Sequence, residues 1–336
     1  MTSDRQLVAA LSDEIDRVMA SLVRGGERVA LVNFPNHANA GDPALWLGEL
    51  ASLARVGAKV VYRASWASYR RDELAHALGH DGTILLHGGG NFGDLYPHNQ
   101  ATTREQVLAD FPRHRTIQLP QSLWFREPAN RDRLRRLCEA HADFTLLVRE
   151  AQSLSLARAH FAVPTLLCPD MVFALGSRAR AALPVVDVLW LARGDVETTG
   201  YAPPPGGEVQ VIDWLDDVSD EPAWPLRDRA ALRLNRRLHL ASPAMARRVL
   251  ALTFAPLARR WVERGCLLLS RGRVVVTDRL HGHILSILQD IPHVVLDNSY
   301  GKLRSMFDTF TRESVTAHWA DSPDEALAQA RALVRP

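Results

Sequence analysis

The chain has 336 residues, 47% of them hydrophobic, and its 40 Lys and Arg residues nearly balance 38 Asp and Glu residues. A net charge of +2 provides no overall attraction to nucleic acid, so no nucleic-acid partner is expected and membrane contact would be at most peripheral. Three widely separated cysteines, the lack of a signal-peptide pattern and the lack of a long apolar run predict a cytoplasmic protein without a disulfide framework. The length suits two domains of about 150 residues each.

The first half of the chain alternates between strand and helix patterns. Apolar residues at helical spacing predict a first helix from Leu7 to Leu22. Alternating strands and helices are then expected over 28–34, 43–55, 58–63, 70–78 and 83–87. This βαβαβ order predicts a parallel sheet with right-handed crossovers. Further along, we expect a helix near 101–110 and strands over 115–119, 144–148 and 165–168.

The pattern loosens near 176–184, where we place a domain boundary. Strands are expected beyond it over 185–192, 208–212, 274–276 and 293–297, and helices near 226–240, 243–263 and 280–288. Ser322 followed by Pro323 and Glu325 is typical of a helix N-terminus and predicts a terminal helix. The expected division is an N-terminal domain over 1–180, a C-terminal domain over 181–320 and a final helix over 321–336.

The stretch 274–288 changes from a β-branched run to an apolar pattern of helical spacing, and Asp278, Arg279, His281 and His283 lie at that change. In open α/β sheets ligands bind beyond the carboxyl ends of the strands, and a helix N-terminus attracts anions. An arginine and two histidines there indicate an anionic substrate that needs a proton, and His281 is suited to transfer it because histidine titrates near neutral pH. Zinc binding is the alternative, but no cysteine or further histidine lies nearby, so we expect no metal.

Residues 88–93 match G-x-G-x-x-G and follow a strand. A dinucleotide site also needs a helix that opens at the last glycine, whereas Asp94-Leu95-Tyr96-Pro97 follows here, so that site is not expected. Three adjacent glycines lose much conformational entropy on folding, which favours a pocket that a substrate approaches over a merely tight turn. Gly89 and Gly90 would line this pocket, and Asn91 and Asp94 would contact hydroxyl groups.

A polar turn at the same sheet edge contains Asn36, His37, Asn39 and Asp42. Asp42 is a good N-cap for the following helix, and capping alone is one explanation of the turn. Asn36, His37 and Asn39 exceed what a cap requires, so we expect the turn and the glycine loop to form a polar pocket of sugar size.

Lys302 is one of only two lysines in the chain. It follows the strand expected over 293–297 and a glycine turn, so it lies at the same sheet edge as 278–283. A solvated surface lysine is the ordinary interpretation of such a residue, and binding of a phosphate group is the alternative.

These motifs resemble those of the polysaccharide pyruvyl transferase family, whose members place a pyruvate ketal on sugars, and the exopolysaccharide members are the most similar. The matching segments, in the order that the family shows, are N-x-G-D at 39–42, H-G-G-G-N-F-G-D at 87–94, L-P-Q-S at 119–122, V-R-E at 148–150 with Ser153, P-D-x-x-F at 169–173, L-A-R-x-D-x-E at 191–197, T-D-R-L-H-G-H at 277–283 and D-N-S-Y-G-K at 297–302. The segment 198–240 matches least.

The resemblance implies two Rossmann-like domains that face each other across a cleft, similar to the B-type glycosyltransferases. It also implies phosphoenolpyruvate as co-substrate without an obligatory cofactor, and a saccharide acceptor that is lipid-linked or nucleotide-linked at the inner face of the cell membrane. Roles in donor binding and catalysis are implied for Arg279, Leu280 and His281, and donor binding for Arg149 and Arg193. The helix N-terminus at 280–283, with Gly282 and His283, and Lys302 would complete the donor site. A homo-oligomer is compatible with the sequence.

Three functions are compatible with this sequence. In ketal transfer, protonated His281 would donate to C3 of phosphoenolpyruvate while a sugar hydroxyl adds to C2, and Asp42, Asp94 or the neutral His281 would act as base for the second hydroxyl. In glycosyl transfer, Arg279 and Lys302 would hold the diphosphate of a nucleotide-sugar and His281 would be the base. A non-catalytic protein that binds polysaccharide precursors is the third hypothesis.

Overall fold

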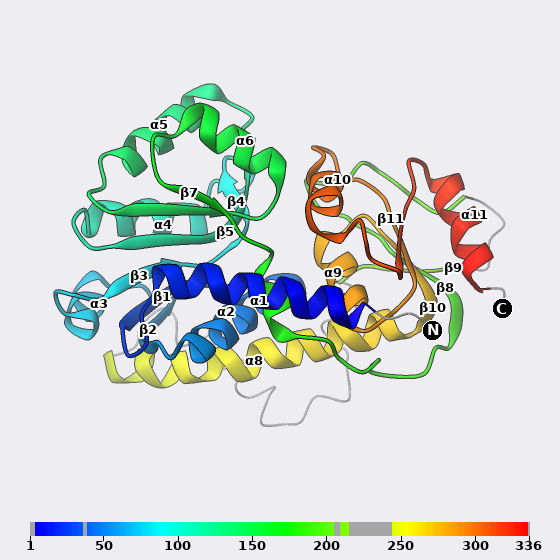
Figure 1. Cartoon of the computed structure of the whole chain (residues 1–336), viewed down its shortest axis with the longest axis horizontal. Coiled ribbons are helices and arrows are strands. Elements are labelled where there is room, and N and C mark those ends of the chain that lie inside the picture. Colours follow the sequence, from blue (N-terminus) through cyan, green and yellow to red (C-terminus); the bar gives the residue numbers. More distant parts are fainter. Residues whose placement is uncertain (1–3, 36–38, 205–208, 215–243, 335–336) are drawn as a thin grey trace.

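The computed structural model describes residues 4–35, 39–204, 209–214 and 244–334 (Figure 1). Their strands form two sheets, in the order β2-β1-β3-β5-β6-β7, with β4 beside β5, and β12-β11-β10-β8-β9. Each of these strand pairs is parallel, which confirms the predicted α/β class. The division into two domains stays a prediction, and its proposed boundary falls in the segment between Leu175 and Val186, which connects the sheets.

The first sheet contains β1 (Arg28–Phe34), β2 (Lys59–Ser65), β3 (Thr83–Leu86), β4 (Gly89–Gly93), β5 (Thr116–Trp124), β6 (Phe144–Val148) and β7 (Thr165–Leu167). The second contains β8 (Val186–Leu191), β9 (Val209–Ile212), β10 (Gly272–Thr277), β11 (His293–Val295) and β12 (Ala317–Trp319). The helices are α1 (Arg5–Leu22), α2 (Gly41–Val56), α3 (Arg71–Leu78), α4 (Gln100–Asp110), α5 (Pro128–Glu139), α6 (Ala151–His160), η1 (Met171–Leu175), α8 (Ala244–Ser270), α9 (Leu280–Leu288), α10 (Lys302–Met306), the π-helix η2 (Phe307–Thr311) and α11 (Pro323–Val334).

One apolar core is shared by both sheets. It contains Ile15 of α1, Trp46 of α2, Phe254 of α8 and Ile284 of α9, together with Leu189 of the second sheet. The helix α8 runs lengthwise beneath both parts of the molecule (Figure 1), and its contacts include α2, β2 and β10. None of the helices in the described residues is both long and apolar enough to cross a membrane.

The start of α2 differs from the sequence-based prediction. The helix begins at Gly41, with Ala40 at the N-cap position and no side-chain cap, so Asp42 lies within the first turn rather than capping it. Asn39 takes over part of the capping function, because its Oδ1 accepts a 2.9 Å hydrogen bond from the N–H of Gly41. The capping explanation for Asp42 was therefore wrong, and Asp42 instead lines a pocket.

The glycine loop is a strand for most of its length. Residues Gly89–Gly93 form β4 and pair with the second half of β5, which extends past its expected end to Trp124. A Cβ at Gly93, whose φ is 155°, would lie 1.7 Å from the carbonyl oxygen of Trp124. This glycine therefore serves close strand pairing rather than substrate access.

The remaining differences are elements, or parts of elements, that the sequence-based prediction left out. Helices α5, α6 and α10 and strand β12 were not predicted, and α8 continues to Ser270, seven residues beyond the expected end at 263. The helix expected near 226–240 lies outside the described residues. The terminal helix is confirmed, and Ser322 Oγ accepts a 3.2 Å hydrogen bond from the N–H of Glu325.

Candidate active site between the two sheets

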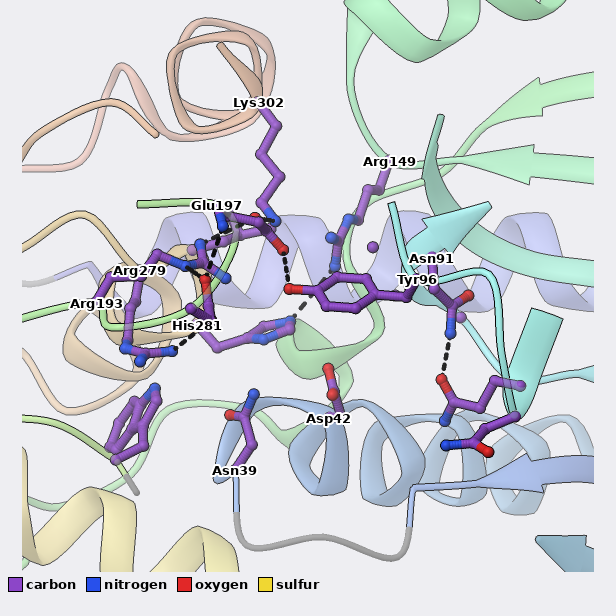
Figure 2. Close-up of a pocket in the computed structure, with 18 of the residues that line it drawn as sticks. Asn39, Asp42, Asn91, Tyr96, Arg149, Arg193, Glu197, Arg279, His281 and Lys302 are labelled. Carbon is purple, nitrogen blue, oxygen red and sulfur yellow. Dashed lines mark hydrogen bonds and ion pairs between the residues drawn. The ribbon is translucent and has the colours of Figure 1, made fainter. Parts of the chain in front are cut away.

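A pocket of about 390 Å³ lies where the carboxyl ends of both sheets face each other (Figure 2). Its walls come from the loops that follow β1, β2, β3, β4, β6, β8, β9 and β10 and from the start of α10. The lining residues include the predicted site residues Asn39, Asp42, Gly89, Gly90, Asn91, Arg149, Arg193, Arg279, Leu280, His281 and Lys302. The fold therefore gathers residues that are far apart in the sequence into one cavity of small-molecule size.

His281 stands beside a buried ion pair of the first sheet. Its Nε2 lies 3.5 Å from Asp170 Oδ2 and 3.4 Å from Arg149 Nη1, and Arg149 Nη1 donates a 2.7 Å hydrogen bond to the same carboxylate. Only 11% of the His281 side chain is exposed, and Arg149 and Asp170 are almost fully buried. Burial opposes charge on Asp170, but hydrogen bonding to His281 and the charges of His281 and Arg149 lower its pKa to about 2. An ionised Asp170 therefore lies 3.5 Å from His281 Nε2.

Gly41 is required where His281 packs against α2. A Cβ at this glycine would lie 2.1 Å from His281 Nδ1, a distance that no side chain tolerates. The N-x-G-D motif is thus explained in part by the close approach of α2 and α9. The same contact places Asp42, the next residue, in the wall of the pocket beside His281.

Two cations approach the glycine loop at Gly90. A Cβ on this residue would lie 3.3 Å from Arg149 Nη2 and 3.4 Å from Lys302 Nζ. Arg149 follows β6 of the first sheet, whereas Lys302 begins α10 after β11 of the second. Two fixed cationic groups, one from each sheet, therefore lie at a backbone with no side chain in the way, which suits a compact anion.

Glu197 holds Lys302 in place. Its carboxylate accepts hydrogen bonds from Lys302 Nζ, from Tyr300 at 3.1 Å and from Tyr96 at 3.1 Å, and Arg193 Nη1 lies 3.0 Å away. Burial opposes charge on Glu197, but Lys302 and Arg193 lower its pKa to about 2. Burial lowers the pKa of Lys302 to about 8, against the opposing effect of Glu197. Lys302 is therefore a buried amine that titrates not far above neutral pH, and the surface interpretation was wrong.

Arg279 is also paired within the protein. Its Nη2 donates hydrogen bonds of 2.6 and 2.7 Å to the two oxygens of Asp213, and Nε donates 2.9 Å to the carbonyl of Ala192. A second carboxylate, Asp195 Oδ2, lies 3.5 Å from Nη1. The preceding residue, Asp278, has a buried Oδ1 without a hydrogen-bond partner, and burial raises its pKa to about 6. The described residues contain no cluster of His, Cys, Asp and Glu side chains that would hold a metal ion.

A sequence profile of the polysaccharide pyruvyl transferase family matches residues 39–300. The chain belongs to this family. "Pyruvyl transferase 1" of Schizosaccharomyces pombe is 35% identical over 90% of the chain and 75% of its own length. "Putative pyruvyl transferase EpsO" of Bacillus subtilis is 29% identical over 92% of the chain and 91% of its own length. A crystal structure of a functionally uncharacterised Klebsiella pneumoniae protein, 17% identical, has a TM-score of 0.58 over 93% of this chain and 99% of that one, which supports the fold alone.

As a member of this family the protein is a pyruvyl transferase, and three of its predicted site residues need correction. His283 is fully buried, and its nitrogens lie 2.8 Å from His293 Nε2 and 2.8 Å from Thr311 Oγ1, so it faces the interior and not the pocket. Gly282 packs against Leu191 and Thr277, away from the pocket lining. Both corrections have one cause, because side chains separated by one or two helical positions from His281 point to other faces of α9.

The carboxylate of Asp94 does not line the pocket either. It accepts hydrogen bonds of 2.7 and 2.9 Å from the N–H groups of Arg126 and Glu127 and one of 2.9 Å from Asn130 Nδ2, all at the start of α5. It therefore holds α5 against the glycine loop and cannot be the base. Asn36 and His37 lie outside the described residues.

Several residues of the site were missed by sequence reasoning. Asp170 and Glu197 belong to the P-D-x-x-F and L-A-R-x-D-x-E motifs, but no role was predicted for them. The signal was the presence of acidic residues in these motifs, since such residues can be buried partners of basic side chains. Tyr96, Trp66 and the turn 98–100 carried no recognisable signal, because aromatic and amide residues in loops are common.

Proposed function

We propose that this enzyme transfers pyruvate from phosphoenolpyruvate to two hydroxyls of one sugar residue in a polysaccharide precursor, forms a cyclic ketal and releases phosphate. The observation that carries this proposal is the approach of Arg149 and Lys302, from different sheets, to Gly90 beside His281. A phosphate and a carboxylate on one small molecule need such fixed cations around a short anionic cavity. We further propose that the two sheets act as facing domains, as in B-type glycosyltransferases.

The charge balance of the pocket supports a proton-donating role for His281. The cations Arg149, Lys302, Arg193 and Arg279 each contact a carboxylate of the protein. A donor anion therefore adds negative charge to a region that is nearly neutral, and His281 lies beside it, next to Arg149. A proton donor at His281 would thus be close to the place where the donor binds.

The reaction removes one proton from each of two sugar hydroxyls and delivers one to C3 and one to the departing phosphate. His281 donates a proton to C3 of phosphoenolpyruvate while the first sugar hydroxyl forms a bond to C2 and passes its own proton to the phosphate oxygens. The C2–O bond to phosphate then breaks, phosphate leaves, and the second hydroxyl adds to C2 and closes the ketal. Asp42, in the wall of the pocket, or the neutral His281 accepts a proton at this stage. Asp94 has no part in this sequence because its carboxylate holds α5.

Thermal stability in the presence of ligands tests the donor. Phosphoenolpyruvate should raise Tm, whereas uridine and guanosine diphosphates at the same concentration should leave it unchanged. A rise with the nucleotides alone would indicate glycosyl transfer and overturn the proposal.

The His281→Ala variant tests the chemistry. It should keep most of the stabilisation by phosphoenolpyruvate and lose phosphate release in the presence of acceptor. His318→Ala is the control, because His318 lies on β12 and outside the pocket lining. Phosphate release at the wild-type rate by His281→Ala would refute the assignment of the general acid.

A further inference from the structure

The pocket is longer than its donor end. In the first sheet Arg149 follows β6 and Trp66 follows β2, and the strands β1, β3 and β5 lie between them. Neighbouring strands are about 4.8 Å apart, so these two lining residues are on the order of 19 Å apart along the sheet edge. A three-carbon donor at Gly90 leaves the end near Trp66 unoccupied.

Trp66 is a large apolar side chain at the end of the pocket that the donor leaves unoccupied. It lines the pocket and remains 46% exposed. The turn that carries it is fixed, because the N–H of Ser65 donates to Ser68 Oγ at 2.9 Å and the N–H of Tyr69 donates to the carbonyl of Ser65 at 3.0 Å. Tyr69 OH donates a 2.8 Å hydrogen bond to Asp110 at the end of α4. The exposure of the indole is therefore imposed by a buried hydrogen-bonded turn.

The start of α4 contributes polar groups to the same pocket. His98, Asn99 and Gln100 are lining residues, and Asn99 has a φ of 56°. Two hydrogen bonds to Asn33 fix Gln100. The backbone carbonyl of Gln100 accepts a 3.0 Å hydrogen bond from Asn33 Nδ2, and Gln100 Nε2 donates a 3.2 Å hydrogen bond to the backbone carbonyl of Asn33. Asn33 has a φ of 80°. Two non-glycine residues with positive φ thus hold this turn in place, and such strain persists where the surroundings fix a functional geometry.

The two ends of the pocket differ in chemistry. The donor end contains paired charges, whereas Trp66 and the turn 98–100 offer an aromatic face, the amide of Asn99 and the imidazole of His98. A pyranose ring has one face of C–H groups and a rim of hydroxyls, which matches an exposed indole beside a hydrogen-bonding amide and imidazole. An anion or a peptide would find no matching cation or strand edge among these residues.

We propose that Trp66 and the turn 98–100 form the acceptor subsite, where one pyranose residue stacks on the indole and its hydroxyls contact His98 and Asn99. The inference rests on the proposed function for the identity of the donor, but the sugar subsite itself does not require it. The remaining saccharide extends past Trp66 toward solvent, which explains why this side chain is half exposed.

The test compares Trp66→Ala with Trp319→Ala, a tryptophan on β12 outside the pocket lining. The probes are methyl β-D-galactopyranoside, methyl β-D-glucopyranoside and methyl α-D-mannopyranoside. Their binding is followed by ligand-observed NMR without donor, and KM is measured by phosphate release with phosphoenolpyruvate. Trp66→Ala should raise the KM of the best glycoside about tenfold and leave the KM of phosphoenolpyruvate within about twofold, because only the sugar loses contact area. Trp319→Ala should change neither KM.

Asn99→Gly is the second variant, because glycine adopts a positive φ without strain and removes only the amide. It should weaken glycoside binding while Tm stays at or above that of the wild type. The proposal is overturned if no glycoside binds the wild type, if Trp66→Ala leaves glycoside binding unchanged, or if it raises both KM values together. Glycoside binding that Trp66→Ala removes, without any phosphate release by the wild type, would keep the subsite and refute only the proposed reaction.

Discussion

The affinity for phosphoenolpyruvate should fall as the pH rises above 8, because Lys302 must be protonated to hold an anion. Burial lowers its pKa to about 8, with Arg193 and Arg149 adding to the shift and Glu197 opposing it. Tyr96 and Tyr300, which share Glu197 with Lys302, have pKa values raised by burial and stay neutral in this range. Phosphoenolpyruvate keeps its full charge above pH 7. If the donor binds as proposed, Lys302 is therefore the group whose loss of charge weakens its binding in this pH range.

The size of the effect follows from the fraction of protonated amine. With a pKa of about 8 in the free enzyme, about nine-tenths of Lys302 is protonated at pH 7 and about 3% at pH 9.5. If the donor binds only the protonated form, its Kd should rise about 30-fold over this interval. Titration calorimetry at intervals of half a pH unit would measure it, in buffers of different ionisation enthalpy so that proton uptake is measured as well.

Two variants separate this mechanism from a general effect of pH. Lys302→Arg keeps its charge, so its Kd should be nearly constant from pH 7 to 9.5, even if it is higher throughout. Lys59→Met removes the only other lysine of the chain, which is exposed on β2, and should retain the wild-type profile. A wild-type Kd that is flat across this range, or a loss of affinity that Lys302→Arg shares, would refute the reasoning.

Three further predictions follow from buried contacts. Gly41→Ala would place a Cβ 2.1 Å from His281 Nδ1, so the ring should shift and kcat should fall by about 100-fold, and unchanged kcat with an unchanged fold would contradict this. Asp170→Ala leaves the buried guanidinium of Arg149 without its 2.7 Å partner and should lower the free energy of unfolding by about 3–5 kcal/mol in urea titrations, whereas Asp170→Asn should lose less. Burial lowers the pKa of His293 from 6.5 to about 4, so the unfolded state binds more protons in that window and stability is lost as pH falls through it. His293→Gln should flatten the dependence of Tm on pH there, and an equally steep profile would refute this origin.

The parallel sheets could be predicted from the sequence because strand and helix periods alternate so regularly. Strand β4 could not, since glycines disfavour strands and only the pairing with β5 stabilises Gly89–Gly93 in an extended form. The start of α2 at Gly41 was missed for a related reason, because the close contact with His281 requires a glycine there and Asn39, not Asp42, accepts the local hydrogen bond.

The composition of the site could be predicted in part, and its charge pairing could not. His281 and Lys302 were expected because they follow strands at the same edge of one predicted sheet, and Arg149 was expected from the family resemblance. Asp170 lies 21 residues from Arg149 but more than a hundred from His281, and Glu197 lies more than a hundred from Lys302, so no local pattern reveals which acid meets which base. Asp94 was misplaced for the same reason, since the N–H groups at the start of α5 that bind it lie more than thirty residues further on.

The site exists only where the two sheets are held together, and the N-terminal residues contribute to this. Asp4, 2% exposed, accepts hydrogen bonds from Ser314 Oγ at 2.7 Å and from the N–H of Val315 at 2.8 Å, at the start of the last strand of the second sheet. From there α1 packs against α2 and η1 of the first part of the chain. Across the pocket itself, Tyr96 reaches Glu197 and Arg149 reaches His281. Neither half of the chain contains both members of these pairs, so this end of the pocket depends on both sheets together and not on either one.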